Sequence, residues 1–462
     1  MKMVPQWRLR AQFAQRLSEM YGREVPAYNT LVDVSRAVND QVLRTAGATA
    51  ERFGSIGRVT AERHGAIRVG TPGELRDVAK IFGALGMHPV GFYDLREAAS
   101  SAVPVVSTAF RPIEADELAR NPFRMFTSML ATGDPRFFDA DLSGRLETFL
   151  ASRRLFSPEL LELAEIAEHD GELTEANAAR FLDLAVGSFE LSAEPIDRGW
   201  YEELEKVSAV AADIGGVRST HVNHLTPRVL DIDELYRRMS RRGIRMIDAI
   251  QGPPDWAGPD VLLRQTSFRA LAEPRAMREP DGTITRDSLR VRFGEVEARG
   301  VALTPAGRGR YDALLKESED RGAGRPAEER AAVARAVWEQ GFPRTERDLV
   351  DHELAYFEFR PAGAGPIPCS GSLADLLGRG LVIAEPITYE DFLPRSAAGI
   401  FQSNLTGAGI RDDGQRAARY DIEWLAATID RTVHDPFELY DRQQRRSVER
   451  LFGERKGTIL AR

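Results

Sequence analysis

The chain has 462 residues, 43% of them apolar and 29% charged, with one cysteine, Cys369, and a formal net charge of −8. This composition allows a sizeable core in several domains or in one large domain with an insertion. The acidic balance argues against a nucleic-acid partner or an anionic membrane surface. One cysteine excludes an intrachain disulfide framework and a cysteine-built zinc site. Because no apolar run has the length of a signal peptide or a membrane span, we expect a cytoplasmic protein.

The first third of the chain predicts helices followed by a βαβββ module. Apolar residues recur at helical spacing within residues 1–53. The pattern then changes to alternating runs, with one helix that begins at Thr71 and Pro72 and ends at Gly86. We therefore predict a first module over 54–133, with strands at 65–69, 88–95, 103–113 and 123–130.

A helical insertion is predicted over 134–212, and the earlier element order then resumes over 213–306. This second module is expected to contain a strand at 220–229, a helix at 231–243, a strand at 244–250 and alternating runs at 261–274 and 287–304. Residues 307–462 are predicted to be a mixed α/β region, joined through a Gly/Pro-rich connector, that completes a pocket.

The two modules echo each other in sequence. When "RHGAIRVGTPGEL" (63–75) is set against "VNHLTPRVLDIDEL" (222–235) with His64 over His224, five identities align without a gap. They are the pairs His64 and His224, Arg68 and Arg228, Val69 and Val229, Glu74 and Glu234, and Leu75 and Leu235. The predicted fold class is therefore α+β, with duplicated βαβββ modules that pair into a curved sheet around a metal site.

The strand periodicity indicates which of the repeated residues point to the same side of the sheet. His64 and Arg68 share one face of their strand, as do His224 and Arg228, while His221 lies an odd number of residues from His224 and points the other way. If the modules pair about a pseudo-twofold axis, His64 and His224 face one cavity and can share a metal ion.

An anionic third ligand is expected on a later strand. In "RFGEVEARG" (292–300), Glu295 and Glu297 share a face, and spacing alone cannot separate them. Two histidines and one carboxylate form the facial triad of non-heme Fe(II) oxygenases. Gln265 and Ser267, which share a face in "RQTSF", are candidate polar pocket residues.

Other interpretations of these residues stay open at this point. A lone strand histidine is more often a hydrogen-bonded structural residue than a ligand, and the paired arginines Arg68 and Arg228 could form salt bridges. His352 and Glu353 begin like an H-E-x-x-H zinc motif, but Tyr356 stands where the second histidine is needed. We therefore reject a zinc protease there.

Five blocks in order resemble the 2-oxoadipate dioxygenase/decarboxylase family, the D-2-hydroxyglutarate synthases of lysine catabolism. They are "RHGAIR", "VNHLTPR", "LLRQTSFRAL", "FGEVEARGVALTPAGR" and "YEDFLPRSAAGIFQSNL". The resemblance spans nearly the whole chain. It implies a divergent vicinal-oxygen-chelate fold, akin to hydroxyphenylpyruvate dioxygenase, with extra helical segments.

The resemblance also implies the site. It makes His64, His224 and Glu295 the ligands of Fe(II) and Arg68 the catalytic clamp for a substrate carboxylate. Two further residues, Arg395 and Ser396, lie in the block expected against the substrate. Arg395 stands where we expect a small apolar side chain, and this could change the accepted chain length.

The implied reaction takes a 2-oxo diacid and O2 to a shortened 2-hydroxy acid and CO2, with no nucleic-acid or membrane partner. The insertion 134–212 and the loop 383–405 are the expected covers of the pocket. Two alternatives remain from other classes: a metal-dependent lyase, isomerase or extradiol-type dioxygenase on the same scaffold, and a non-catalytic small-molecule-binding protein.

Overall fold

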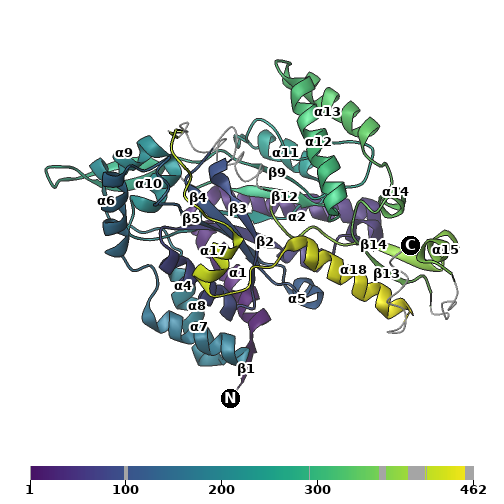
Figure 1. The fold of residues 1–462 in the computed structure, drawn as a ribbon, viewed down its shortest axis with the longest axis horizontal. Coiled ribbons are helices and arrows are strands. Elements are labelled where there is room, and N and C mark those ends of the chain that lie inside the picture. Colours follow the sequence, from purple (N-terminus) through teal and green to yellow (C-terminus); the bar gives the residue numbers. More distant parts are fainter. Residues whose placement is uncertain are drawn as a thin grey trace.

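A computed structural model describes residues 2–97, 102–290, 292–363, 371–393, 411–412 and 414–452. Its centre is a five-stranded sheet in the order β3-β4-β5-β2-β8 (Figure 1). The strands are β2 (Arg63–Val69), β3 (His88–Asp94), β4 (Val105–Arg111), β5 (Arg124–Leu130) and β8 (His224–Pro227). β2 pairs with β5 in parallel and with β8 antiparallel. The first predicted βαβββ module is thus confirmed, with α4 (Pro72–Ala84) as its helix.

The sheet continues beyond β8. β12 (Glu295–Arg299) pairs antiparallel with β9 (Leu263–Ser267), and a parallel bridge joins Arg228 to Glu297. α11 (Ile232–Arg241) follows β8 as α4 follows β2. The second module therefore repeats the strand order of the first, and the parallel β8–β12 contact matches the parallel β2–β5 pair.

Two details of the second module differ from the sequence prediction. Residues 244–250 form no continuous strand: only bridges from Met246 to Phe268 and from Gln251 to Gln265 are present. Between these bridges the outer segment has two residues more than β9 offers, so Asp248 bulges into solvent and the ladder breaks. Second, the runs 261–274 and 287–304 enclose an unpredicted hairpin, β10 (Glu273–Arg278) with β11 (Ile284–Leu289), inserted between β9 and β12.

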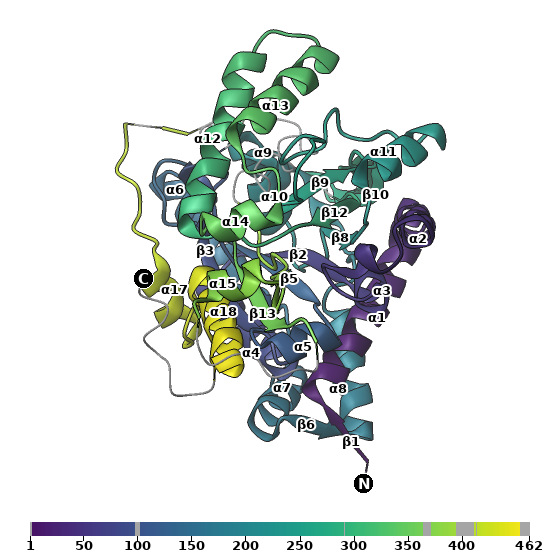
Figure 2. The same ribbon diagram turned by 90° about the vertical axis from the view of Figure 1, so that its right-hand side faces the viewer.

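Helices cover both faces of the sheet (Figures 1 and 2). The N-terminal segment contains β1 (Met3–Pro5), α1 (Gln6–Glu24), α2 (Pro26–Ala46), η1 (Gly47–Glu51) and α3 (Ile56–Ala61). The segment between the modules contains α6 (Ala140–Ala151), α7 (Pro158–Asp170), α8 (Glu175–Gly187), α9 (Arg198–Val207) and α10 (Ala209–Gly215). It also has the short strands β6 (Glu172–Thr174), paired with β1, and β7 (Ile196–Asp197), paired with β10; α5 (Ala115–Arg120) and η2 (Leu95–Glu97) lie within the first module.

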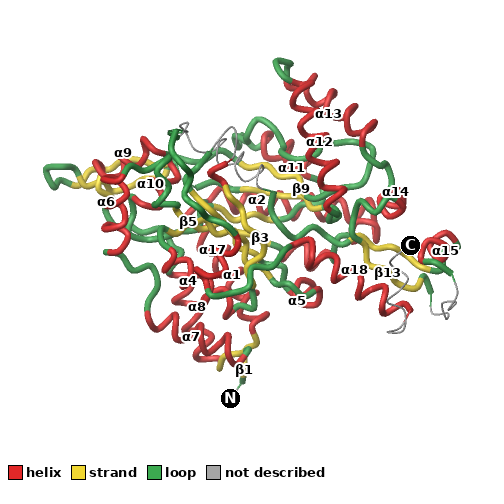
Figure 3. Tube along the Cα trace, viewed as in Figure 1, coloured by secondary structure: helices red, strands yellow, loops and turns green. Residues whose placement is uncertain are grey.

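Most of the C-terminal part packs on a core of its own, whereas α17 (Ile422–Ile429) packs on α4 in the large apolar core. The C-terminal part contains α12 (Pro305–Gly322), α13 (Ala327–Gly341), α14 (Glu346–Asp351), β13 (Phe357–Pro361), α15 (Leu373–Gly378), β14 (Val382–Pro386), α17 and α18 (Pro436–Phe452). α12 and α13 project from the body as a helical hairpin (Figure 3). α18 lies against β13, where Phe359 N donates to Ser447 Oγ at 3.0 Å. No helix of the described ranges is both long and apolar enough to cross a membrane.

Side chains along β2 alternate between the face that packs into the large apolar core and the face that carries the site. Ile67 and Val69 point into the large apolar core with α1 and α4, whereas Ala66 belongs to the core on the other face. His64 and Arg68 share the face of Ala66, as the period of two requires. Local signals fix the following helix: Thr71 and Glu74 form a capping box at the start of α4, and Gly86 adopts a positive φ of 66° just after its end.

Candidate metal centre

The pairing of β2 with β8 brings the two echoed histidines together. His64 lies opposite Thr226 and His224 lies opposite Ala66, so the strands cross about a pseudo-twofold point at Gly65 and Leu225. The two histidines are thus diagonal neighbours on one face, within reach of each other. Their ring centroids are 5.4 Å apart and the ring planes are nearly perpendicular.

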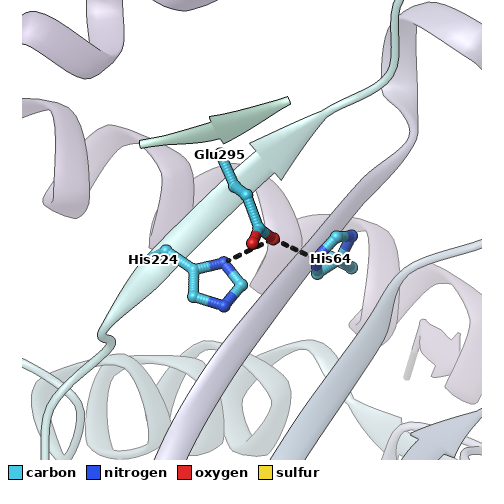
Figure 4. A group of neighbouring side chains, drawn as sticks. All are labelled: His64, His224 and Glu295. Atoms are coloured by element: carbon cyan, nitrogen blue, oxygen red, sulfur yellow. Dashed lines mark hydrogen bonds and ion pairs between the residues drawn. The ribbon is translucent and has the colours of Figure 1, made fainter. Parts of the chain in front are cut away.

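Glu295, the first residue of β12, completes the group. Its Oε2 lies 3.1 Å from His64 Nε2 and 3.4 Å from His224 Nδ1 (Figure 4). One ligand atom from each of the three residues lies within 4.8 Å of the others. All three side chains are buried, so their polar atoms converge on a point that bulk water does not fill.

Three neighbours hold these side chains. Thr226 Oγ1 donates to Glu295 Oε2 at 3.1 Å and lies 3.1 Å from His224 Nδ1. Phe293 stacks on the His224 ring at 5.2 Å, and Phe392 meets the His64 ring edge-on at 5.0 Å. The aromatic rings restrict both imidazoles to one orientation and give the site apolar walls.

The structure separates the two glutamates that spacing could not. Glu297 is tied to Arg299 by hydrogen bonds of 2.7 and 2.9 Å and lies 3.4 Å from Arg124 Nη1. Its Oε2 also contacts His64 Nδ1 at 3.1 Å, without the alignment of a hydrogen bond. Glu297 therefore supports His64 from behind, while Glu295 faces the shared point.

Burial and these contacts set the protonation of the group. Burial lowers the pKa of His224 to about 4, so at neutral pH its ring is neutral and has a lone pair for a ligand. For His64, burial acts against the charged form, but Glu297 and Glu295 more than offset it and raise the pKa. Burial opposes ionisation of Glu295 too, but the two histidines lower the pKa of its carboxyl group.

Arg68 lies on the same face of β2 as His64. Its guanidinium is held by an acidic residue that the sequence analysis did not predict. It forms a buried ion pair with Asp213 of α10, and Thr220 Oγ1 donates to its main-chain oxygen at 2.7 Å. Asn223 Nδ2 donates to Asp213 Oδ2 at 3.0 Å, and His221 Nε2 lies 3.4 Å from Asp213 Oδ1. Burial disfavours the charged Asp213, yet His221 and Arg68 lower the pKa of its carboxyl group.

Other predicted residues fall into three groups. Ser267 lies across from Glu295 and Gln265 across from Glu297, so both share the face of the site. Arg228, the counterpart of Arg68, forms a buried ion pair with Glu62 at 2.9 Å. Arg395 and Ser396 lie outside the described residues, as does much of the loop 383–405.

Sequence reasoning did not single out Thr226, Phe392, Asp213 or the supporting role of Glu297. Thr226 could have been found, because it shares the strand face of His224. Asp213 and Phe392 carried no local signal, because they lie far along the chain from the residues they contact.

The donor set fits a divalent transition metal. Two imidazoles and one carboxylate form a mixed N/O set, which suits Fe(II), Zn(II) or Mn(II) better than a purely oxygen-seeking cation. A buried carboxylate oxygen with three polar neighbours, which are His64, His224 and Thr226, is also what a metal ligand with outer support requires.

The comparisons with known proteins point the same way. The family model "2-oxoadipate dioxygenase/decarboxylase" matches residues 13–404. A protein of that name from Mycobacterium tuberculosis (strain ATCC 25618 / H37Rv) is 57% identical over 433 residues, 94% of this chain and 95% of its own length. One from Pseudomonas putida is 39% identical over 453 residues, 96% of this chain and 95% of its own length.

A solved structure shows the same fold. The hydroxyglutarate synthase from Pseudomonas putida in complex with 2-oxoadipate superposes with a TM-score of 0.84 at 36% identity, covering 98% of each chain. The family model spans well over half of the sequence, and the relatives match it nearly from end to end. The chain therefore belongs to the 2-oxoadipate dioxygenase/decarboxylase family.

Proposed function

We propose that this chain is a cytoplasmic Fe(II)-dependent oxygenase that converts 2-oxoadipate and O2 to D-2-hydroxyglutarate and CO2, as a step of lysine catabolism. The atoms balance: the carboxylate next to the keto group leaves as CO2 with its own two oxygens, and both atoms of O2 enter the five-carbon product, one in its new carboxylate and one in its hydroxyl group. The observation that carries the proposal is the buried group of His64, His224 and Glu295.

His64, His224 and Glu295 would hold the metal. A bound Fe(II) supplies the redox chemistry with O2, and a set of three protein ligands leaves positions for a substrate that brings its own 2-oxo acid group. The remaining tasks fall to the protein.

Arg68 would bind one carboxylate of the diacid in bidentate fashion, which fixes the chain so that the 2-oxo end reaches the metal centre. Asp213 holds the Arg68 guanidinium in place before the substrate arrives. The substrate carboxylate would then join a charge pair that already exists, so Arg68 is orientated at little further entropic cost.

Phe392 and Phe293 would limit water around the reacting carbon, since their rings pack on the two histidines. Ser267 and Gln265 would line the same face as polar contacts, and Ser396 would contact the substrate from the loop. If the side chain of Arg395 faces the pocket, its charge would favour a diacid over a monoacid.

The test is oxygen uptake by Fe(II)-loaded protein on addition of 2-oxoadipate, together with detection of 2-hydroxyglutarate. A lyase or isomerase on this scaffold would turn over under nitrogen, and a binding protein would not turn over at all. An anaerobic titration with shorter and longer 2-oxo diacids, followed by the visible charge-transfer band that chelation produces, would report the preferred length.

A further inference from the structure

A cavity of about 490 Å³ is lined in part by Asp213, the ion-pair partner of Arg68. Its wall is built from the segment before α9, the turn after α10 and the hairpin strands β10 and β11. Asp213 and His221 belong to this wall, although neither belongs to the group of His64, His224 and Glu295. The volume suits a small organic ligand.

The inner wall carries a buried cation. Arg275 is 9% exposed, and its Nη2 has no hydrogen-bond partner among the described residues. The nearest carboxylate, Glu273, lies 3.9 Å away and is bound instead by Arg292 Nε, at 3.0 and 2.9 Å. A buried guanidinium with an unused donor costs stability, so the cavity side of Arg275 calls for an anion.

The mouth of the cavity is also lined by positively charged side chains. Arg218 and Arg278 line it, and neither forms an ion pair within the described part of the chain. Among the acidic residues of the wall, Asp213 is already paired with Arg68, and Asp197 accepts a hydrogen bond from Trp200 N at 2.9 Å. Glu194 and Asp197 remain to oppose the three arginines, so the wall has an excess of one positive charge.

We infer that this cavity is a second anion site, which binds a small dicarboxylate with one carboxylate on Arg275 and the other toward Arg218 and Arg278. Arginine is the side chain best suited to hold a carboxylate in bidentate fashion. The choice of a dicarboxylate, rather than another anion, rests on the proposed function, whose substrate and product are both dicarboxylates. Asp213 lines this site and also forms the ion pair with Arg68, so the two sites share one residue.

The test is calorimetric titration of the full-length, metal-loaded protein with glutarate under nitrogen. Glutarate has two carboxylates but no 2-oxo group, so it is not turned over. We expect two sites per chain in the wild type. Arg275→Gln should weaken one of them by at least about tenfold, because the buried charge that pairs with the ligand is lost. Arg278→Gln should weaken the same site by a smaller factor.

The matched control is Arg286→Gln, on the same hairpin but outside the cavity wall. A wild-type isotherm with one site, or an Arg275→Gln isotherm equal to that of the wild type, would overturn the inference. If Arg275→Gln lowers the melting temperature too far for titration, the exposed Arg278→Gln decides by the same criterion. Equally tight binding of inorganic phosphate would overturn the choice of a dicarboxylate.

Failure of this inference is distinct from failure of the proposed function, because glutarate binding needs no turnover. Protein that consumes no oxygen with 2-oxoadipate but loses glutarate binding in Arg275→Gln would contradict only the proposed function. Protein that is an active oxygenase with one glutarate site would contradict only the second anion site.

Discussion

His64 Nδ1 lies 3.1 Å from Glu297 Oε2, while Nε2 of the same ring lies 3.1 Å from Glu295. The imidazole is therefore held between two carboxylates on one strand of the second module. The negative charge of Glu297 favours the tautomer with the proton on Nδ1, which would leave Nε2 for a metal.

Glu297→Gln should lower the metal affinity by about 10- to 100-fold, as is typical when a supporting residue of a metal ligand is changed. The measurement is competition with a chelator of known affinity. Glu385→Gln, on exposed strand β14, is the control and should leave the affinity unchanged. An unchanged affinity in Glu297→Gln would show that His64 needs no such support.

Arg68→Gln should raise KM for 2-oxoadipate by at least about 30-fold, because loss of a buried charge partner costs about 2–5 kcal/mol. The metal content should stay at the wild-type level, since Arg68 is not in the ligand group. Steady-state kinetics and metal analysis of the same preparation provide the measurement. Loss of metal in this variant would contradict the role of a substrate clamp.

Arg228→Gln tests whether the internal counterpart of Arg68 is structural. Arg228 and Glu62 form a buried pair, and Glu62 also binds Arg124 at 2.7 Å. Breaking such a pair destabilises a protein by about 3–5 kcal/mol. We expect a clear fall in the denaturant midpoint and, in the folded fraction, an unchanged KM. A raised KM at full stability would mean that both echoed arginines bind substrate.

Gly65→Ala tests the close packing of the paired strands. A Cβ there would lie 2.9 Å from Met125 Sδ and 3.0 Å from Leu225 Cδ2. Overpacking of this kind costs about 1–3 kcal/mol, which thermal or chemical denaturation would reveal. Gly144→Ala is the control: it lies in α6 with nothing within 4 Å of the added atom, so it should be neutral or stabilising. Equal stability of both variants would contradict the packing argument.

The sequence was sufficient to predict the duplicated modules and the meeting of His64 and His224 on one face, because strand periodicity and the internal repeat are local signals. It could not choose between Glu295 and Glu297, which share a face. The choice depends on Arg299 and Arg124, which form ion pairs with Glu297 in the folded chain. The internal repeat could not identify the carboxylate ligand either. In the first module, the position on β5 that corresponds to Glu295 of β12 is occupied by Phe126.

The hairpin β10–β11 and the bulge at Asp248 were missed for a related reason. Alternating runs predict strands but not which neighbour each strand pairs with, and segment 244–251 forms bridges only to Gln265 of β9 and to Phe268 just after it. Asp213 was also missed, since a single aspartate at the end of a helix gives no sign that it will meet Arg68 across the fold.

The central claim is that two imidazoles from the paired modules and the Glu295 carboxylate bind one metal ion. Iron analysis of protein purified without chelator and loaded anaerobically with Fe(II) tests it, by comparison of the wild type with folded His64→Ala and Glu295→Ala variants. We predict about one tightly held iron per chain in the wild type and nearly none in either variant. Equal iron in all three proteins would contradict the account.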